Sequence, residues 1–295
     1  LDYFELRDDL LSEDQVNICF ELVPNGQILF SFRDELLQKK SFKRIEKNKC
    51  MVDWPLEFGD LPQKWISPSR TIISCHDKKD DAERFEDILK RLDFFKDKCC
   101  LLKLAPKINN LKELEAGHDW LKLNPQQNCF LPRCSDNFNL NMSFYRLLTK
   151  KINKLNFIKE YDFFNFTEDQ PFLIEWICEN FSHLSFDKRR FAAIVGDPVK
   201  HSLTPTTHMD YFFKKSMPVV RINLTREKFS KQDLLFLLNL GLSAAAITSP
   251  LKVLAFEHCE KKSPRVKKFQ SCNTFALSSK DKILMGENTD YVGLE

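Results

Sequence analysis

Short apolar runs recur along the first 185 residues, and charged segments of helical composition separate most of them. Apolar runs of this length between polar segments predict buried strands, and the charged segments predict helices. Strands that alternate with helices form parallel β/α units, so this part of the chain is predicted to be α/β. The predicted strands cover residues 3–6, 28–32, 50–54, 71–75, 99–104, 128–131 and 162–166.

Two architectures fit this alternation. The seven predicted strands are one fewer than a (β/α)8 TIM-type barrel contains. Because the chain begins at Leu1 rather than Met, directly before the first predicted strand, we expect a barrel that lacks its first strand. A doubly wound open sheet is the alternative that the pattern leaves open.

The last third of the chain has a pattern of its own. A charged segment at 187–190 follows a predicted helix, and we place a domain boundary there, between residues 1–186 and residues 187–295. Beyond the boundary the pattern predicts a second, smaller α/β domain. Its predicted strands cover residues 191–195, 219–224 and 243–248, and its predicted helices cover residues 206–215 and 226–240.

Composition excludes several classes of function. The net charge is +3, from 45 basic and 42 acidic residues, which gives no field that would attract nucleic acid or an anionic membrane. No apolar run is long enough to span a membrane, and the first residues do not have the pattern of a signal peptide. The ten cysteines are scattered without metal-ligand spacing and are predicted to be reduced thiols. We therefore expect a cytoplasmic protein without a metal site.

Charged side chains stand near the C-terminal ends of the predicted strands, where β/α barrels carry their chemistry. These side chains are Glu5, Arg7, Arg33, His76, Asp77 and Lys103. Apolar residues flank Lys103 on both sides, and desolvation lowers the pKa of an amine. Lys103 is thus a candidate Schiff-base nucleophile, and His76 would move the proton that imine chemistry requires. The alternatives are a lysine that extends to solvent and a structural histidine.

A polar loop follows the predicted strand at 191–195. A Gly-Asp-Pro turn ends this strand, and the loop then carries His201, Ser202 and Thr204. Open α/β sheets bind ligands in loops at the C-terminal ends of their strands. The loop is therefore a candidate binding site, and an ordinary βα turn with a polar surface is the alternative.

Four motifs of the last third, in this order, resemble shikimate dehydrogenase. They are Gly-Asp-Pro-Val-Lys-His-Ser-Leu-Thr-Pro at 196–205, Ile-Thr-Ser-Pro-Leu-Lys at 247–252, Ser-Cys-Asn-Thr at 271–274 and Gly-Glu-Asn-Thr-Asp at 286–290. The resemblance implies that hydroxyls bind the carboxylate of a shikimate-like acid and that a lysine and an aspartate form the catalytic pair. The implied carboxylate ligands are Ser202 and Thr204, the implied ligands of ring hydroxyls are Thr248, Asn273 and Asp290, and the implied catalytic pair is Lys252 and Asp290.

The same motifs depart from the family at three positions. Thr204 replaces a serine and keeps the hydroxyl, whereas Ala246 and Met209 each replace an asparagine. The resemblance also implies NADP as the cofactor of the complete dehydrogenase. No Gly-rich dinucleotide fingerprint occurs in the chain, which has seven glycines, and Tyr291 stands where the family has the glycine that leads into its NADP domain. We expect a chain cut before that domain.

Four segments of the first part resemble type I 3-dehydroquinate dehydratase. They are Phe-Glu-Leu-Arg-x-Asp-Leu-Leu at 4–11, Phe-Ser-Phe-Arg at 30–33, Ile-Ile-Ser-Cys-His-Asp at 72–77 and Leu-Leu-Lys-Leu-Ala at 101–105. The resemblance implies a cofactor-free reaction, with an imine on Lys103, His76 as general acid and base, and Glu5 orienting the histidine. It implies substrate-anchoring side chains at Arg7 and Arg33 and, as weaker matches, at Arg146 and Gln170.

The family's Glu-Gly-Gly loop is absent, since Asp-Glu-Leu-Leu stands at residues 34–37. Together the two resemblances imply a bifunctional enzyme of the shikimate pathway. The first domain would dehydrate 3-dehydroquinate to 3-dehydroshikimate, and the second would serve the reduction of 3-dehydroshikimate to shikimate. The alternatives are a non-catalytic module that binds shikimate- or quinate-like acids, which the missing loop suggests, and a quinate dehydrogenase.

Overall fold

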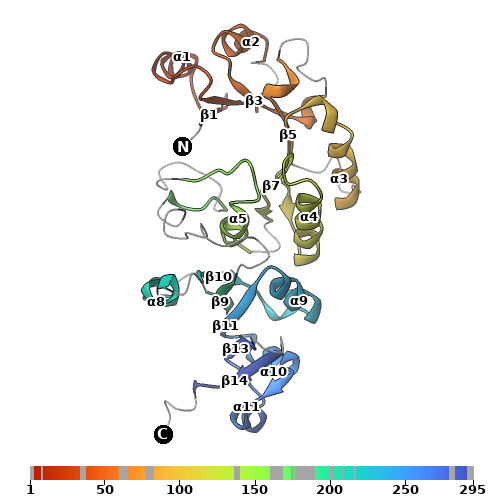
Figure 1. The fold of residues 1–295 in the computed structure, drawn as a ribbon, viewed down its shortest axis with the longest axis vertical. Coiled ribbons are helices and arrows are strands. Elements are labelled where there is room, and N and C mark those ends of the chain that lie inside the picture. Colours follow the sequence, from red (N-terminus) through yellow and green to blue (C-terminus); the bar gives the residue numbers. More distant parts are fainter. Residues whose placement is uncertain are drawn as a thin grey trace. The chain divides into compact units, whose positions relative to one another are not determined.

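The computed structural model of the chain describes residues 3–7, 9–33, 38–59, 66–76, 83–135, 140–159, 169–173, 176, 190–199, 202–207, 209–214, 217–278 and 283–290. The chain forms two compact units (Figure 1). The first consists of Leu1–Lys107, Ala116–Pro132 and Lys151–Leu155, and the second of Ile108–Glu115, Arg133–Lys150 and Asn156–Glu295. The predicted strand at 162–166 and the predicted boundary between 186 and 187 lie outside the described residues. No helix of the described part is long and apolar enough to cross a membrane.

The first unit is built on a sheet of six parallel strands in the order β1-β2-β3-β4-β5-β7. These strands confirm six of the seven predicted ones. They are β1 (Phe4–Arg7), β2 (Ile28–Ser31), β3 (Met51–Pro55), β4 (Thr71–Cys75), β5 (Leu101–Leu104) and β7 (Asn128–Phe130). The elements between them are α1 (Glu13–Leu22), α2 (Gln38–Lys47), the 3-10 turns η2 (Leu56–Phe58) and η4 (Pro68–Arg70), α3 (Phe85–Asp93), η5 (Lys96–Lys98), β6 (Lys107–Ile108) and α4 (Leu111–Leu123).

The strand order decides between the two predicted architectures. A doubly wound sheet reverses its strand order at a switch point, whereas here each described strand of the sheet pairs with the next one along the chain. The doubly wound alternative is therefore wrong for the described strands. Chain order is also the order of a β/α barrel, but these six strands form an open sheet with β1 and β7 at its edges, and the predicted closed architecture is not formed by them.

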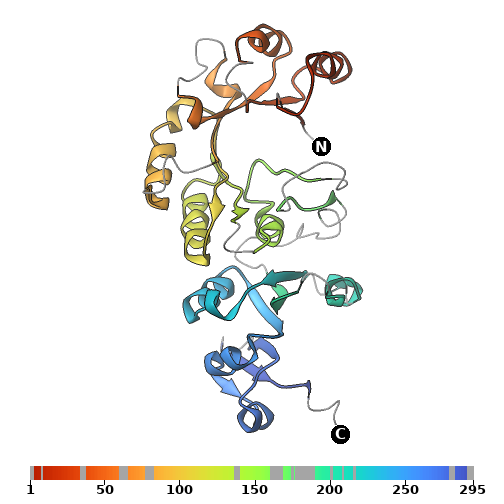
Figure 2. The same ribbon diagram turned by 180° about the vertical axis from the view of Figure 1, so that it is seen from behind.

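The two faces of this sheet differ in polarity. The register places Ser31 beside Asp53 and Ser74 beside Lys103, and all of these residues lie on one face because side chains alternate along a strand. The opposite face is apolar, and α1 and α2 pack against it on one side of the sheet (Figures 1 and 2). Its buried cluster is Leu6, Val16, Ile28, Phe30, Phe32, Phe42, Ile45, Cys50, Val52, Trp54 and Ile66.

The second unit contains a mixed sheet of six strands in the order β10-β9-β11-β13-β14-β12. The first three are parallel, β13 runs antiparallel to both of its neighbours, and β12 is parallel to β14. The strands are β9 (Phe191–Gly196), β10 (Val219–Asn223), β11 (Leu242–Ile247), β12 (Lys261–Lys262), β13 (Thr274–Leu277) and β14 (Leu284–Glu287), and β8 (Arg133–Cys134) lies earlier in the unit. The helical elements are α5 (Ser143–Thr149), α7 (Thr204–Thr207), α8 (Met209–Lys214), η7 (Arg226–Lys228), α9 (Lys231–Asn239), α10 (Lys252–His258) and α11 (Pro264–Phe269).

All three strands predicted for this unit are confirmed. The single helix predicted at 226–240 is instead a 3-10 turn followed by α9. The reason is local: Ser230 accepts a hydrogen bond from the backbone N–H of Asp233, and the Asp233 carboxylate accepts one from the backbone N–H of Ser230. This capping box fixes the start of α9 at Lys231.

Gly196 allows the end of β9 to lie against the loop that follows β11. A Cβ atom at this position would stand 2.3 Å from Cγ2 of Thr248 and 2.8 Å from the carbonyl oxygen of Ser249. The backbone N–H of Asp197 donates to that same oxygen at 3.0 Å. Any other residue would force these two loops apart.

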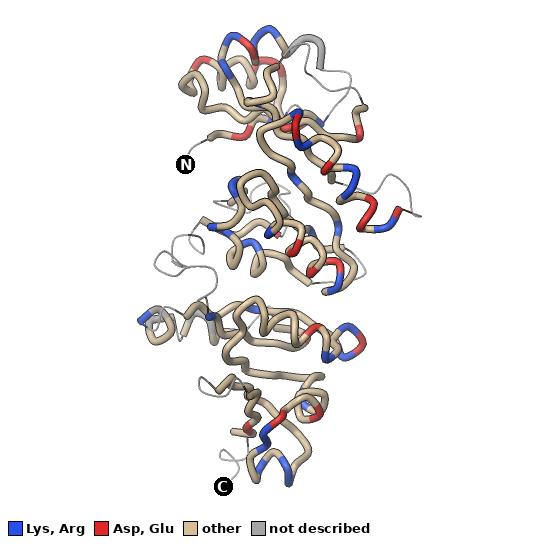
Figure 3. The backbone as a smooth tube through the Cα atoms, turned by 45° about the vertical axis from the view of Figure 1, so that its right-hand side comes forward, with Lys and Arg blue, Asp and Glu red and all other residues tan. Residues whose placement is uncertain are grey.

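Charges are interleaved along the described helices (Figure 3). In α3 the acidic residues Glu86 and Asp87 stand in the first turn, and the basic residues Lys90 and Arg91 stand in the last. This order complements the helix dipole, which favours negative charge at the N-terminus and positive charge at the C-terminus.

Candidate functional sites

A cluster of charged side chains lies on the polar face of the first unit's sheet. Nζ of Lys103 lies 2.5 Å from Oδ2 of Asp53, and Nη2 of Arg33 lies 3.1 Å from the same oxygen. Nη2 of Arg33 also lies 3.3 Å from Nε2 of His76. We call these four residues the Asp53 cluster. The structure thus brings three predicted site residues together around a carboxylate that the sequence interpretation missed.

Asp53 is an ionised carboxylate inside the protein. Its burial raises its pKa, but the positive charges of Lys103 and Arg33, with a contribution from His76, lower it by more, so the pKa of Asp53 lies well below its usual range. Oδ1 of Asp53 and Oγ of Ser74 are among several buried side-chain atoms that have no hydrogen-bond partner among the described residues. Buried polar atoms ordinarily have one, so each of these two atoms could bind a ligand or water.

The environment of Lys103 differs from the predicted one. Its neighbours Leu102 and Leu104 are buried on the opposite face of the sheet, because side chains alternate along a strand. The predicted burial of Lys103 is confirmed, since Lys103 is 4% exposed, but these two leucines do not supply it. Instead of an apolar pocket, the amine has the carboxylate of Asp53 beside it. An amine must be unprotonated to attack a carbonyl group, so Schiff-base chemistry here requires a proton to leave this ion pair.

The contacts of Glu5 and Glu57 differ from those expected of the carboxylate that orients His76. The predicted carboxylate, Glu5, accepts a hydrogen bond from the hydroxyl of Ser31 at 2.7 Å, and it is not bonded to His76. Glu57 instead accepts from the backbone N–H of His76 at 3.0 Å. Because a guanidinium only donates, Nε2 of His76 can accept a hydrogen bond from Arg33 only when the imidazole is neutral and carries its proton on Nδ1.

The remaining predicted residues of the dehydratase site are Arg7, Arg146 and Gln170. Arg7 donates from Nε and Nη2 to the carboxylate of Asp9, at 3.0 and 2.6 Å. Arg146 is 3% exposed in α5, and Gln170 is half-buried. Both belong to the second unit. Their assignment as substrate anchors stays a prediction, and Asp77 lies outside the described residues.

The second unit has a site of its own at the C-terminal ends of the parallel strands of its sheet. Nζ of Lys252, at the start of α10, lies 2.6 Å from Oδ2 of Asp290. Nδ2 of Asn273 donates to the other oxygen of Asp290 at 2.7 Å. Oδ1 of Asn273 accepts from the backbone N–H of Thr289 at 3.0 Å. We call Lys252, Asn273 and Asp290 the Lys252 triad. All three members were predicted, whereas Thr289, which helps to orient Asn273, was missed.

The topology of the mixed sheet brings this triad together. The parallel strands β9 and β11 have their C-terminal ends on the same side of the sheet. Because β13 runs antiparallel to β11, Asn273, the residue before β13, lies beside these C-terminal ends, and its carbonyl accepts from the backbone N–H of Ile247 at 2.7 Å. Strand β14 is antiparallel to β13 and returns the chain to the same side, where the backbone N–H of Asn273 donates to the carbonyl of Glu287 at 3.1 Å.

The predicted carboxylate ligands lie after the end of β9. Oγ of Ser202 donates to Oγ1 of Thr204 at 3.4 Å, so the two hydroxyls are neighbours. We call them the hydroxyl pair. Thr248 follows β11, is half-buried, and donates its backbone N–H to the carbonyl of Val195 in β9. His201 lies outside the described residues.

The Lys252 triad can hold and move a proton. The hydrogen bond from Lys252 lowers the pKa of Asp290 below its ordinary value, partly opposed by burial, and the bond from Asn273 lowers it further. The side chains of Lys252 and Asp290 are 35% and 54% exposed, so both remain accessible to a ligand. An accessible ammonium beside an ionised carboxylate is a donor that can be oriented toward a substrate oxygen.

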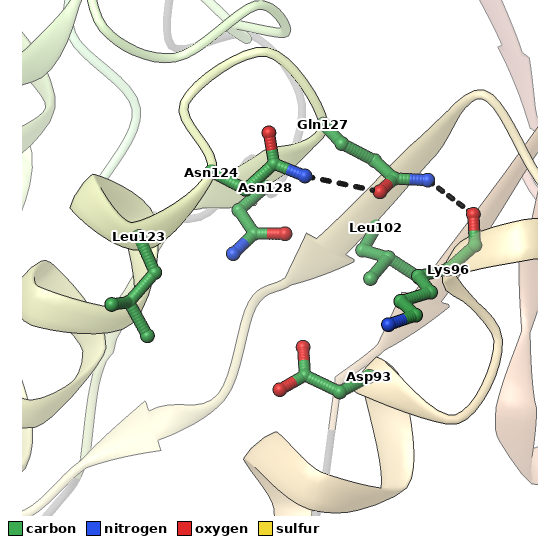
Figure 4. A pocket seen from close by; sticks show the side chains of 7 residues that line it. All are labelled: Asp93, Lys96, Leu102, Leu123, Asn124, Gln127 and Asn128. Atoms are coloured by element: carbon green, nitrogen blue, oxygen red, sulfur yellow. Dashed lines mark hydrogen bonds between the residues drawn. The ribbon is translucent and has the colours of Figure 1, made fainter.

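A separate hollow of about 240 Å³ lies in the first unit, where loops precede β5 and β7. Figure 4 shows that its polar side chains bind one another: Asn124 donates to Gln127, and Gln127 donates to the carbonyl of Lys96. Asp93 accepts from the indole N–H of Trp120. Because these polar groups form hydrogen bonds within the protein, we interpret the hollow as a space left by packing and not as a binding site. Among the described residues, no three His, Cys, Asp or Glu side chains lie close enough to hold a metal ion.

Comparison with known proteins concerns mainly the second unit. Residues 194–275 match the model of the shikimate dehydrogenase substrate binding domain. A shikimate dehydrogenase (NADP(+)) of Helicobacter hepaticus is 35% identical over 103 residues, which are 35% of this chain and 38% of that protein. One of Bacillus cereus is 31% identical over 106 residues, which are 36% of this chain and 38% of that protein. The chain therefore spans less than half the length of these relatives.

One solved structure aligns with nearly the whole chain. The structure of dehydroquinate dehydratase and shikimate dehydrogenase from S. pombe AroM covers 99% of this chain and 61% of its own, with 16% identity and a TM-score of 0.45. At this TM-score the similarity decides nothing about the first unit. The second unit thus contains a segment similar to the substrate binding domain of shikimate dehydrogenases, and two members of the Lys252 triad, Lys252 and Asn273, lie within it.

Proposed function

We propose that the second unit binds a shikimate-like hydroxy acid and transfers a proton at one of its oxygens, as part of a shikimate dehydrogenase-type reaction. The observation that carries this proposal is the Lys252 triad. It joins a cation, an amide and a carboxylate from separate segments of the chain within hydrogen-bond distance. Two of its three members lie in the segment that resembles a substrate binding domain.

The geometry suggests a role for each group. The hydroxyl pair would bind the substrate carboxylate, because each hydroxyl can donate one hydrogen bond. Thr248, Asn273 and Asp290 would bind ring hydroxyls. Lys252 would stabilise the negative charge that develops on the substrate oxygen during reduction and would supply its proton, while Asp290 holds the amine in place.

The relatives are named as NADP(+) enzymes, and a nicotinamide dinucleotide supplies the hydride in such a reaction. The residues of this chain do not fit that cofactor. A dinucleotide turn needs closely spaced glycines between a strand and a helix, whereas the turn after β9 has Gly196 alone. We therefore derive no hydride step from this chain. Its proposed contribution is to bind the acid and to hold the proton.

Calorimetric titration of the chain with shikimate tests this proposal. We expect one molecule of shikimate to bind per chain, and Lys252→Met to weaken binding by about tenfold through loss of a charged hydrogen bond. Lys261→Met is the matched control, because Lys261 is an exposed lysine of the same unit, and it should leave the affinity unchanged. Failure of the wild-type chain to bind shikimate would refute the proposal. Titration with quinate in parallel tests the quinate dehydrogenase alternative, which predicts tighter binding of quinate.

For the first unit we propose 3-dehydroquinate dehydratase chemistry with Lys103 as the Schiff-base nucleophile. A specific observation favours it: the amine of Lys103 is buried and paired with Asp53, Arg33 contacts the same carboxylate, and Arg33 also contacts His76. Asp53 would accept or return the proton that the amine must lose, and His76 would serve as acid and base on the substrate.

Reduction with borohydride in the presence of 3-dehydroquinate tests this second function. A Schiff base would be trapped as a stable amine, and mass spectrometry of the digested chain should place the adduct on Lys103. Lys103→Ala should lose the adduct, whereas Lys90→Ala, which removes a lysine 74% exposed in α3, should keep it. Shikimate binding without any trapped adduct would instead support the non-catalytic module.

A further inference from the structure

We infer that Arg221 determines the specificity of the proposed acid site, by supplying the positive charge that selects a carboxylate over a neutral group. This inference rests on the proposed function of the second unit. Hydroxyl groups both donate and accept hydrogen bonds, so the hydroxyl pair alone would not distinguish a carboxylate from a carboxamide. A cation beside the pair would make that distinction.

Strand β10 places Arg221 next to the hydroxyl pair. Nη2 of Arg221 donates to the main-chain carbonyl of Ser202 at 2.8 Å, and Nε donates to the same oxygen at 3.3 Å. Two residues further along β10, Oδ1 of Asn223 accepts from the backbone N–H of Val199 at 3.2 Å. Two side chains of β10 therefore hold the chain at Val199 and at Ser202, close to the hydroxyl pair.

Arg221 carries a charge that its surroundings do not neutralise. It is half-buried, and no carboxylate among the described residues forms an ion pair with it. The other cation of the proposed site, Lys252, is paired with Asp290. A guanidinium bonded only to a main-chain carbonyl keeps its full charge, and it attracts an anion that binds nearby.

The distance is short enough for a measurable effect. The covalent geometry of a serine places its side-chain oxygen within about 4.5 Å of its own carbonyl oxygen, so the guanidinium lies within about 7 Å of Oγ of Ser202. A carboxylate bound by this hydroxyl lies up to about 3 Å further away. Across about 10 Å, Coulomb's law gives about a twofold gain in affinity for an anion in bulk water and about a sixteenfold gain at an effective dielectric constant of about 20. A half-buried site lies between these limits, so we expect about tenfold.

The test compares shikimate with its neutral carboxamide, by calorimetric titration of the whole chain. Arg221→Gln keeps a donor for the Ser202 carbonyl but removes the charge. It should bind shikimate about tenfold more weakly and the carboxamide within about twofold of wild type. Arg221→Lys, which keeps the charge, should recover most of the lost affinity for shikimate. Arg226→Gln is the matched control, because it removes an exposed charge from the same unit and should change neither affinity.

Equal weakening of both ligands by Arg221→Gln would overturn the inference, because it would show that Arg221 only holds the loop. Unchanged binding of shikimate would overturn it as well. If Arg221→Gln does not fold, the salt dependence of binding to the wild-type chain is the deciding measurement. Raising the ionic strength should weaken the binding of shikimate and leave the binding of the carboxamide unchanged, and equal salt effects on both would refute the role of Arg221. A wild-type chain that binds neither ligand would instead contradict the proposed function, and with it this inference.

Discussion

Breaking the ion pair between Asp53 and Lys103 should destabilise the first unit strongly. At the observed 2.5 Å, with an effective dielectric constant of about 20, the gross attraction between the two charges is about 7 kcal/mol. The cost of burying both charges offsets much of this. Removing Asp53 leaves the buried amine of Lys103 without this counter-ion, and the loss of one partner of a buried pair costs about 3–5 kcal/mol. Removing Lys103 leaves Asp53 in contact with Arg33, so the lower end of this range applies. We therefore expect Asp53→Asn and Lys103→Met each to lower the free energy of unfolding by about 3 kcal/mol.

The double variant isolates the interaction. With both charges gone, Arg33 loses its contact with Asp53, and because Arg33 is 19% exposed it can turn toward water. The double variant should therefore be more stable than the sum of the single changes by about 2–3 kcal/mol. Urea unfolding monitored by tryptophan fluorescence measures this, because Trp54 and Trp120 are buried in the first unit, at 3% and 2% exposure. The matched control is the surface pair Arg84 and Asp87, whose coupling should stay below about 0.5 kcal/mol. A coupling equally small for the buried pair would refute the reasoning.

Three further predictions follow from the same structure. Because the pKa of Asp53 is lower in the folded than in the unfolded chain, its contribution to stability is present above about pH 5 and is lost as the pH falls; urea unfolding between pH 3 and pH 7 should show this loss, and Asp53→Asn should show a shallower slope. Gly196→Ala should lower the free energy of unfolding by about 3 kcal/mol, because its Cβ would overlap with Thr248 and Ser249. Gly26→Ala, which has no atom within 4 Å of its new Cβ, should lower it by about 1 kcal/mol, from its backbone angle alone. Thermal unfolding compares the two variants, and equal losses of unfolding free energy would contradict the overlap. Asn273→Ala should cost about 2 kcal/mol and weaken shikimate binding measurably, because it leaves Thr289 and Asp290 without a shared partner, while the exposed Asn239→Ala should do neither in parallel unfolding and titration experiments.

The sequence predicted most of the strands because their apolar runs are short and clearly bounded. It did not predict Asp53. A charged residue between Val52 and Trp54 in a buried strand was itself a signal, since it alternates onto the same face as Ser31 in the observed register. The partner of Lys103 could not be read from its neighbours along the chain, because pairing across strands depends on register.

The Lys252 triad was named in advance only because its motifs resemble a known family. Periodicity alone does not place Asn273 beside Asp290. Their proximity comes from the reversal of direction between β13 and β14, two strands that were not predicted. Arg221 and Asn223 were missed for a related reason: each looks like an ordinary polar residue of an edge strand until β10 is paired with β9.

The antiparallel return through β14 has a consequence for the order of folding. Lys252 and Asp290 are 38 residues apart along the chain, and they meet only after β13 and β14 have paired. Contacts between residues that are distant along the chain form late, because closing the long loop between them costs conformational entropy before the contact can stabilise the fold. In a chain emerging from the ribosome, β9, β10 and β11 could associate well before Asp290 is available. Affinity for the acid should therefore arise in the last step of folding of this unit, and ligand binding would draw nascent chains toward the completed sheet.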